Sequence, residues 1–246
     1  MILIHRDYLE FKNKFISYLL LWFSIPMLLY LCLTVPLSSY IDQVNLMNYK
    51  YWSLPGIWIC SSCLMSFLYS FVKLKTLASN EEYLNRYLKS PISNGQILSS
   101  LLISSILAGL FQLICSIVTT SSLSGLVITT SQAPIILFNI LILLIFFSTV
   151  GLFCAFYFHD HIFSTILSLI ILIFLMFGCG TFLPVNEFPN NFLILIANFP
   201  IYGLIYNVQL SYQYSRIIIS PIVVATIINI SMFIIVLIIS YKKFRK

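Results

Sequence analysis

Long uncharged apolar stretches alternate with short polar segments along the whole chain. Six stretches lack any charged residue, and each is long enough to cross a bilayer, which takes roughly 20 apolar residues. They cover residues 15–36, 54–72, 97–118, 135–158, 162–183 and 221–241. None shows the alternating polar and apolar positions of a transmembrane β-strand, and backbone groups in lipid must be hydrogen-bonded within their own segment. The pattern therefore predicts an all-α polytopic membrane protein with six transmembrane helices.

The composition excludes a water-soluble globule. Of the 246 residues, 60% are hydrophobic and 8% are charged, and the mean hydropathy is +1.02. Soluble domains devote about a quarter of their residues to charge. Because six crossings use most of the chain, we expect residues 1–246 to form a single transmembrane domain with no soluble catalytic module.

The positions of the basic residues predict the orientation. Eleven of the thirteen Lys and Arg residues lie before the first span, between the second and third, or after the sixth, and the other two are Lys50 and Arg216. By the positive-inside rule, both termini should face the cytoplasm, with the spans in the plasma or inner cell membrane. The net charge of +6 is then a topological signal. We expect contact with membrane lipid and no nucleic-acid partner.

The segment between the fifth and sixth spans, 184–220, is expected to re-enter the membrane from the outer face. Its uncharged part, 188–215, contains Pro189, Pro200, Gly203 and six amide side chains. A crossing there would place the basic C-terminal tail outside the cell. Broken, polar backbone is tolerated at membrane depth only against protein or water. We therefore predict an outer re-entrant helical hairpin before the last span.

The first 14 residues are expected to form an interfacial helix. Ile4, Tyr8 and Phe11 repeat at the spacing of one helix face, while charged residues mostly occupy the others. This pattern is typical of a helix that lies in the membrane interface. A plain extension of the first span is the alternative.

The segment 73–95 is the one sizeable cytoplasmic loop of the predicted topology. Ser79 and Asn80 are suitable caps for a short helix that begins with acidic residues. Such a helix would carry an apolar strip that consists of Leu84, Tyr87 and Leu88. A solvated connector whose charges only fix topology is equally compatible with this pattern.

The sequence contains few features that would let this chain drive transport by itself. A phosphate-binding loop needs a Gly-rich turn followed by Gly-Lys, and the chain has eight Gly and no Gly-Lys pair. We therefore do not expect it to hydrolyse ATP. Proton-coupled carriers hold ionisable residues within their spans, and the six predicted spans contain none. Sodium coupling through carbonyl and hydroxyl groups is still compatible with the sequence, so an ion-coupled secondary transporter is the rival hypothesis.

Two clusters of metal-ligand residue types were considered. His159, Asp160 and His161 join the fourth and fifth spans, but consecutive helical side chains diverge by about 100°, which favours a polar hinge over a metal site. Cys60 and Cys63 have CxxC spacing but lie inside a span without a second pair nearby. All six cysteines are interpreted as reduced packing residues.

Small and amide residues within the spans should mediate helix packing. Ser105 and Gly109 form a small pair that lets helix backbones approach closely in lipid. The contact could lie within one protomer or between two, and we favour the former. The amide side chains expected to face protein or the pathway are Gln112, Asn139 and Asn229.

Several short motifs, in order, resemble the permease subunits of type 2 ABC transporters, which are six-span exporters of drugs, lipids and polysaccharides. The likeness covers essentially the whole chain. The motifs are Leu54-Pro55-Gly56, Leu88-Lys89-Ser90-Pro91-Ile92-Ser93, Gly180-Thr181-Phe182-Leu183-Pro184, and Ala197-Asn198-Phe199-Pro200, with Pro189 between the last two. A haem-exporter-type permease is a further alternative within the same superfamily.

The resemblance implies roles that the residues alone do not. The loop 73–95 would carry a coupling helix that docks on a separate ATP-binding subunit, and the segment 184–220 would cap the pathway on the outer face. The implied docking residues are Glu81, Glu82, Leu84, Arg86, Tyr87 and Leu88. The implied residues of the outer gate are Pro184, Pro189, Asn198, Pro200 and Tyr202.

The resemblance also implies the partners. Two permease protomers, identical or different, would assemble with two ATP-binding subunits, which would hold ATP and Mg. This chain itself would hold no cofactor, metal or catalytic residue. Drug, peptide, lipid and glycan cargoes are all compatible with the sequence.

Overall fold

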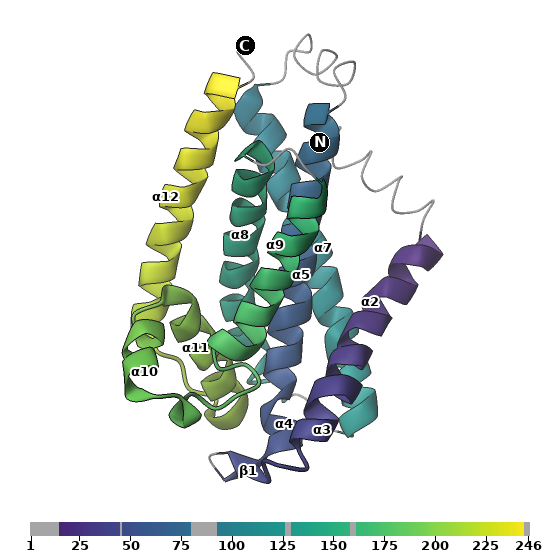
Figure 1. Ribbon diagram of the computed structural model, residues 1–246, viewed down its shortest axis with the longest axis vertical. Coiled ribbons are helices and arrows are strands. Elements are labelled where there is room, and N and C mark those ends of the chain that lie inside the picture. Colours follow the sequence, from purple (N-terminus) through teal and green to yellow (C-terminus); the bar gives the residue numbers. More distant parts are fainter. Residues whose placement is uncertain (1–14, 45, 80–92, 126–128, 158–160, 244–246) are drawn as a thin grey trace.

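The computed structural model describes residues 15–44, 46–79, 93–125, 129–157 and 161–243. Long helices run side by side, and short elements gather at one end of the bundle, at the bottom of Figure 1. The first half contains α2 (Phe15–Leu29), η1 (Tyr30–Thr34), α3 (Val35–Leu37), β1 (Gln43–Val44), β2 (Met47–Asn48), α4 (Tyr49–Trp52), α5 (Leu54–Ser79) and α7 (Asn94–Ser124). The second half contains α8 (Ala133–Tyr157), α9 (His161–Ile173), η2 (Phe174–Gly178), η3 (Val185–Glu187), α10 (Asn190–Ala197), α11 (Pro200–Tyr214) and α12 (Ile219–Lys243). The two strands pair as one short antiparallel hairpin.

The helices confirm an all-α polytopic membrane protein. Five of them are long and apolar enough to cross a membrane, and a bent helix pair is a candidate for a sixth crossing or a re-entrant loop. The five are Phe15–Leu37, Tyr49–Leu77, Asn94–Ser124, Ala133–Tyr157 and Ile219–Tyr241. They correspond to the first four predicted spans and the last one.

The fifth predicted span, 162–183, ends earlier than its hydropathy indicates. Helix α9 continues through the π-helical turn η2 and stops at Gly178. From Cys179 to Pro184 the chain is neither helix nor strand. The two helices that follow, α10 and α11, are bent by 92° at their junction, as expected of the broken segment 184–220.

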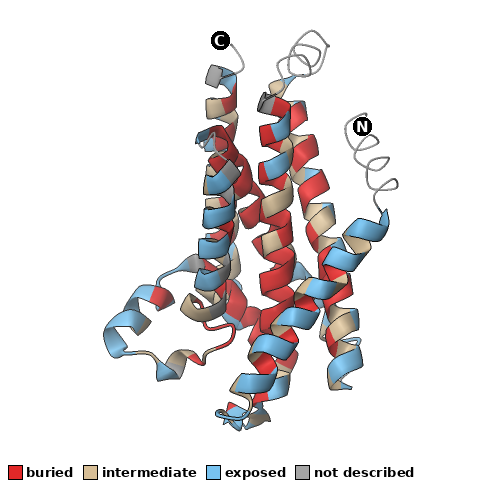
Figure 2. Ribbon diagram, turned by 45° about the vertical axis from the view of Figure 1, so that its right-hand side comes forward, coloured by how far each residue is buried: buried red, intermediate tan, exposed pale blue. Residues whose placement is uncertain are grey.

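Helix α5 occupies the centre of the bundle and packs along α7 and α8. Figure 2 shows buried residues along the central helices and exposed ones on the peripheral helices. In α5, 72% of the most apolar stretch is buried inside the protein, against 17% in α2 and 17% in α12. Helices α2 and α12 therefore present most of their surface outward, whereas most of the α5 surface faces other helices.

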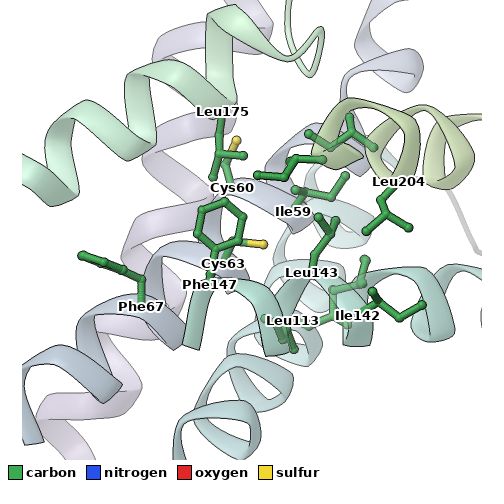
Figure 3. Packing of buried hydrophobic residues seen from close by; sticks show 14 of the residues in the cluster. Ile59, Cys60, Cys63, Phe67, Leu113, Ile142, Leu143, Phe147, Leu175 and Leu204 are labelled. Atoms are coloured by element: carbon green, nitrogen blue, oxygen red, sulfur yellow. The ribbon is translucent and has the colours of Figure 1, made fainter. Parts of the chain in front are cut away.

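The core forms where α5 meets α7, α8, η2 and α11. Figure 3 shows Cys60 and Cys63 of α5 close to Phe147 of α8, Leu175 of η2 and Leu204 of α11. Both thiols are free and buried. They pack as small apolar groups among larger ones.

Hydroxyl and indole groups cross-link the central helices. The Ser61 and Ser116 hydroxyls are 2.7 Å apart, which joins α5 to α7, and the Trp58 indole donates to the Thr120 hydroxyl at 2.8 Å. The small pair on α7 also packs inside the chain, because Gly109 lies against Ser62 of α5 and Leu144 of α8. Such small polar residues hold helices together in lipid, where burial of apolar surface contributes little to association.

Candidate functional site

The predicted docking loop is only partly described by the structure. Residues 80–92 lie outside the described residues, and with them Glu81, Glu82, Leu84, Arg86, Tyr87 and Leu88. The predicted interfacial helix 1–14 and the residues His159 and Asp160 also lie outside. The roles assigned to these residues stay predictions.

The flanks of the docking loop are well defined. Helix α5 ends at Ser79 and α7 begins at Asn94 at the same end of the bundle, where α9 begins and α12 ends (Figure 1). The start of α7 is a capping box, in which the Ser93 hydroxyl accepts from the Gln96 amide and the Gln96 side chain accepts from the Ser93 amide. This cap satisfies backbone donors and fixes where the helix starts.

A buried lysine near the end of α5 was missed by the sequence analysis. Lys75 falls within the predicted loop, yet it lies on the helix and is 6% exposed. Its Nζ lies 5.4 Å from the centre of the Phe71 ring and has no hydrogen-bond partner in the described part of the chain. The aromatic face compensates part of the charge. Sequence alone could not show this, because the burial depends on the neighbouring helices.

At the opposite end of the bundle, the non-helical segment Cys179–Pro184 is folded into the protein. Cys179, Thr181 and Phe182 are each at most 1% exposed. Gly180 has a φ of +74°, which glycine adopts without steric cost. The segment thus turns back into this end of the bundle instead of continuing α9.

Three consecutive carbonyl groups of this segment lie against three different elements, and two of them accept hydrogen bonds. The Gly180 carbonyl accepts from the Gln209 side chain of α11 at 2.9 Å, and the Phe182 carbonyl accepts from the Tyr49 hydroxyl of α4 at 2.7 Å. Between them, the Thr181 carbonyl oxygen lies 2.5 Å from the position that a Cβ on Gly56 of α5 would take. We call this arrangement the three-carbonyl clamp.

The clamp explains two of the motifs that carry the family resemblance. Gly56 of the motif Leu54-Pro55-Gly56 has no side chain, which leaves room on α5 for another backbone. The backbone of the motif Gly180-Thr181-Phe182-Leu183-Pro184 rests there through Thr181. The contact between the two motifs was not predicted, because 123 positions separate Gly56 from Cys179 in the sequence. Tyr49 and Gln209 were also missed, since neither belongs to a motif.

The residues predicted for the outer gate occupy different environments. Pro184 is buried next to the clamp, whereas Pro189 and Asn198 are exposed at the two ends of α10. Pro200 is the first residue of α11. Tyr202 is half-buried and stacks on Tyr206, with ring centres 6.0 Å apart. The structure therefore buries Pro184, whereas the one side-chain hydrogen bond of Asn198 found among the described residues goes to the Ile194 carbonyl of its own helix.

Helix α11 is anchored on several sides. The Gln132 side chain donates to the Tyr212 carbonyl at 2.8 Å, and the Tyr212 ring meets the edge of Trp58 on α5 at 5.5 Å. Asn207 both donates to the Ile218 carbonyl at 2.7 Å and accepts from the Ile218 amide at 3.0 Å. These contacts hold α11, and with it Gln209, at a fixed place beside α5, α8 and the start of α12.

No catalytic or metal centre is visible in the described ranges. Groups of three or more His, Cys, Asp or Glu side chains that could hold a metal ion are not found there. What the described residues do form is a helical bundle with the buried segment Cys179–Pro184 at one end and the flanks of the predicted docking loop at the other.

The comparison with known families agrees with this architecture. Residues 1–211 match the family model described as ABC-2 type transporter. The chain therefore belongs to the ABC-2 type transporter family, and it is a membrane-embedded permease component of an ABC transporter rather than the ATPase. None of the curated proteins and none of the solved structures matches the chain.

Proposed function

We propose that this chain is the permease subunit of an ATP-driven exporter, that it forms the substrate pathway, and that a separate ATP-binding subunit drives it. The family match over residues 1–211 carries this proposal. The shape of the bundle supports it, because a single unbroken helix, α5, runs from the outer clamp to the start of the predicted docking loop (Figure 1).

In the proposed assembly, two permease protomers sit on two ATP-binding subunits in the plasma or inner membrane. ATP and Mg are held by the partner subunits. The ends of α5 and α12 face the cytoplasm, because most basic residues of the sequence flank that end. The outer clamp and the pair α10 and α11 then face the outside of the cell.

The docking contact is proposed to be the apolar strip of the loop, Leu84, Tyr87 and Leu88, bordered by the charges Glu81, Glu82 and Arg86. Apolar side chains at the centre of a contact and charges at its rim are the usual arrangement of a protein interface. Truncation of the central residues, or the introduction of a charge there, is therefore expected to weaken binding the most.

Replacement of Leu84, Tyr87 and Leu88 by Asp tests the proposal. We expect the triple variant to insert normally and to lose co-purification with the partner ATPase, because three carboxylates would be buried in the contact without partners. The matched control carries Asn85→Asp and Lys89→Asp, which change the net charge by the same amount but lie four residues apart on the face of the predicted helix away from the predicted strip. It should still bind the ATPase.

Two results would contradict this function. Undiminished co-purification of the triple variant would show that the strip is not the docking contact. The absence of any ATP-binding partner for the unaltered chain, in membranes solubilised under mild conditions, would favour the ion-coupled carrier, which needs no such subunit.

A further inference from the structure

The three-carbonyl clamp is unusual because side chains, rather than regular backbone pairing, support a buried stretch of chain. A buried carbonyl group without a partner is costly, so stretches outside helices and strands need other donors. Here the donors are the Tyr49 hydroxyl and the Gln209 amide, which come from two separate elements. The position of the segment Cys179–Pro184 therefore depends on where α4 and α11 stand relative to each other.

A second set of contacts ties the segment to η2 and to α5. The Thr181 hydroxyl donates to the Leu175 carbonyl at 2.5 Å, and the Cys60 sulfur lies 3.8 Å from the same hydroxyl oxygen. Gly56 lets the Thr181 backbone rest directly on α5. If α5 moved along its axis or rotated about it, the segment would have to move too, because no flexible side chain lies between the two backbones at Gly56.

Helix α5 reaches both ends of the bundle. Helix α4 leads into it through Ser53, whose amide donates to the Tyr49 carbonyl at 3.0 Å, and α5 then continues without a break to Ser79. Tyr49 and Gly56 are therefore carried by the same rigid unit that enters the predicted docking loop. A rigid element with one end at each site is a physical route for coupling between them.

We propose that Tyr49 and Gln209 are positioning residues for transport: they hold the segment Cys179–Pro184 across the outer end of the pathway, and their two hydrogen bonds to it break when the pathway opens outward. This inference rests on the proposed function for its direction. It adds to that function two residues that set the equilibrium between a closed and an open outer end of the pathway.

The natural thiol of Cys179 reports on the opening. Cys179 lies in the segment and is 1% exposed, so a maleimide can reach it only when the segment leaves its place. Cys115 of α7 is also buried, at 4% exposure, but belongs to a separate cluster with Trp22 and Met65. It reports on general loosening of the bundle.

The experiment uses full-length chains with one cysteine each, either Cys179 or Cys115, in membranes of intact cells. A membrane-impermeant maleimide is added from outside, and the labelling rate is measured for Tyr49→Phe and for Gln209→Leu. The control substitutions are Tyr51→Phe and Gln213→Leu, for which no side-chain hydrogen bond is found in the described residues. Each control substitution removes the same chemical group as its test substitution, a hydroxyl or an amide, from a position two or four residues away.

We expect each test substitution to raise the Cys179 labelling rate by about 2- to 12-fold, which is what the loss of one hydrogen bond does to an opening equilibrium. The Cys115 rate and both control substitutions should show no change. Tyr49→Phe removes one oxygen atom and keeps the ring, so it serves even if Gln209→Leu accumulates poorly.

Either of two results would overturn the proposal. An unchanged Cys179 rate in both test variants would show that the hydrogen bonds do not hold the segment closed. An equal rise at Cys115 would show that the substitutions loosen the whole bundle. Because labelling requires neither the ATPase nor a cargo, this outcome is separate from the docking experiment, which alone decides the proposed function.

Discussion

Asn207 and Asn229 show two ways in which a buried amide is accommodated within the bundle. Asn207 uses both ends of its side chain, as donor and as acceptor, to join α11 to the chain before α12. Asn229 donates to the Ile142 carbonyl of α8 at 3.1 Å, but its oxygen has no hydrogen-bond partner among the described residues. A half-satisfied amide contributes less than a fully satisfied one, because its free oxygen has lost its solvation without compensation.

The two asparagines should therefore respond differently to replacement by leucine. We expect Asn207→Leu to lower stability by about 1–3 kcal/mol, because the backbone groups of Ile218 lose their partner. Asn229→Leu should change stability by less than about 1 kcal/mol, because it also removes an unpaired buried oxygen. Thermal unfolding of the detergent-solubilised protein measures both. A larger loss for Asn229→Leu would show that its oxygen is satisfied in the membrane.

At the scale of elements, the contact between α5 and the segment Cys179–Pro184 depends on the absence of one side chain. A Cβ at position 56 would meet the Thr181 carbonyl oxygen at 2.5 Å. That distance is well inside van der Waals contact, and the obstacle is backbone, which cannot swing aside as a long side chain can. Either α5 or the segment Cys179–Pro184 must shift if position 56 holds any residue other than glycine.

Gly56→Ala is accordingly expected to destabilise the protein by about 1–3 kcal/mol, the usual range for an overpacked interior. The matched control is Gly95→Ala, where the added Cβ would find only the end of the Leu237 side chain at 3.9 Å. That change lies within α7 and should be neutral or stabilising by up to about 1 kcal/mol, because alanine is the better helix former. Melting temperatures of the two variants, measured side by side, check the contrast. Similar values would contradict the close approach seen at Gly56.

Most of the helical layout was predictable from sequence, and the end of α9 shows why the rest was not. The first four spans and the last one appear near their predicted positions, because in lipid an uncharged apolar run of sufficient length has few alternatives to a helix. Cys179 to Phe182 also carries no charge, so the uncharged stretch continued the predicted fifth span to 183. The chain leaves the helix because Gln209 and Tyr49 supply donors from 29 and 133 residues away. The local sequence pattern cannot predict hydrogen bonds to partners so far away in the chain.

The candidate site was predictable only in outline. The outer broken pair was expected from Pro189 and Pro200, whose positions mark where α10 and α11 begin. The burial of Lys75 was not expected, since a lysine at the end of a span usually keeps its charged group in water. The docking loop stays a prediction that rests on the apolar strip and on the family.

For the whole molecule, the arrangement of helix ends predicts which surfaces face the outside of the cell. Tyr40 is 86% exposed and follows α3 at the end of the bundle opposite the end of α12 (Figure 1). In a chain whose six native cysteines are replaced, we expect Tyr40→Cys to react with an impermeant maleimide added to intact cells. Lys246→Cys should react only after the membrane is permeabilised, because both termini are proposed to be cytoplasmic. Labelling of Lys246→Cys in intact cells would overturn the proposed topology, and with it the position of the docking loop.

The unequal burial of α5 and α12 also bears on how the protein is made. Of the five long helices, α5 is the least apolar and the most enclosed, whereas α12 is the most apolar and among the least enclosed. A nascent α12 can partition from the translocon into lipid by its own affinity. The partners of Ser61 and Ser66 on α7 and α8 are synthesised only after α5. Helix α5 can therefore reach its enclosed position only after the chain has been made as far as the end of α8 at Tyr157.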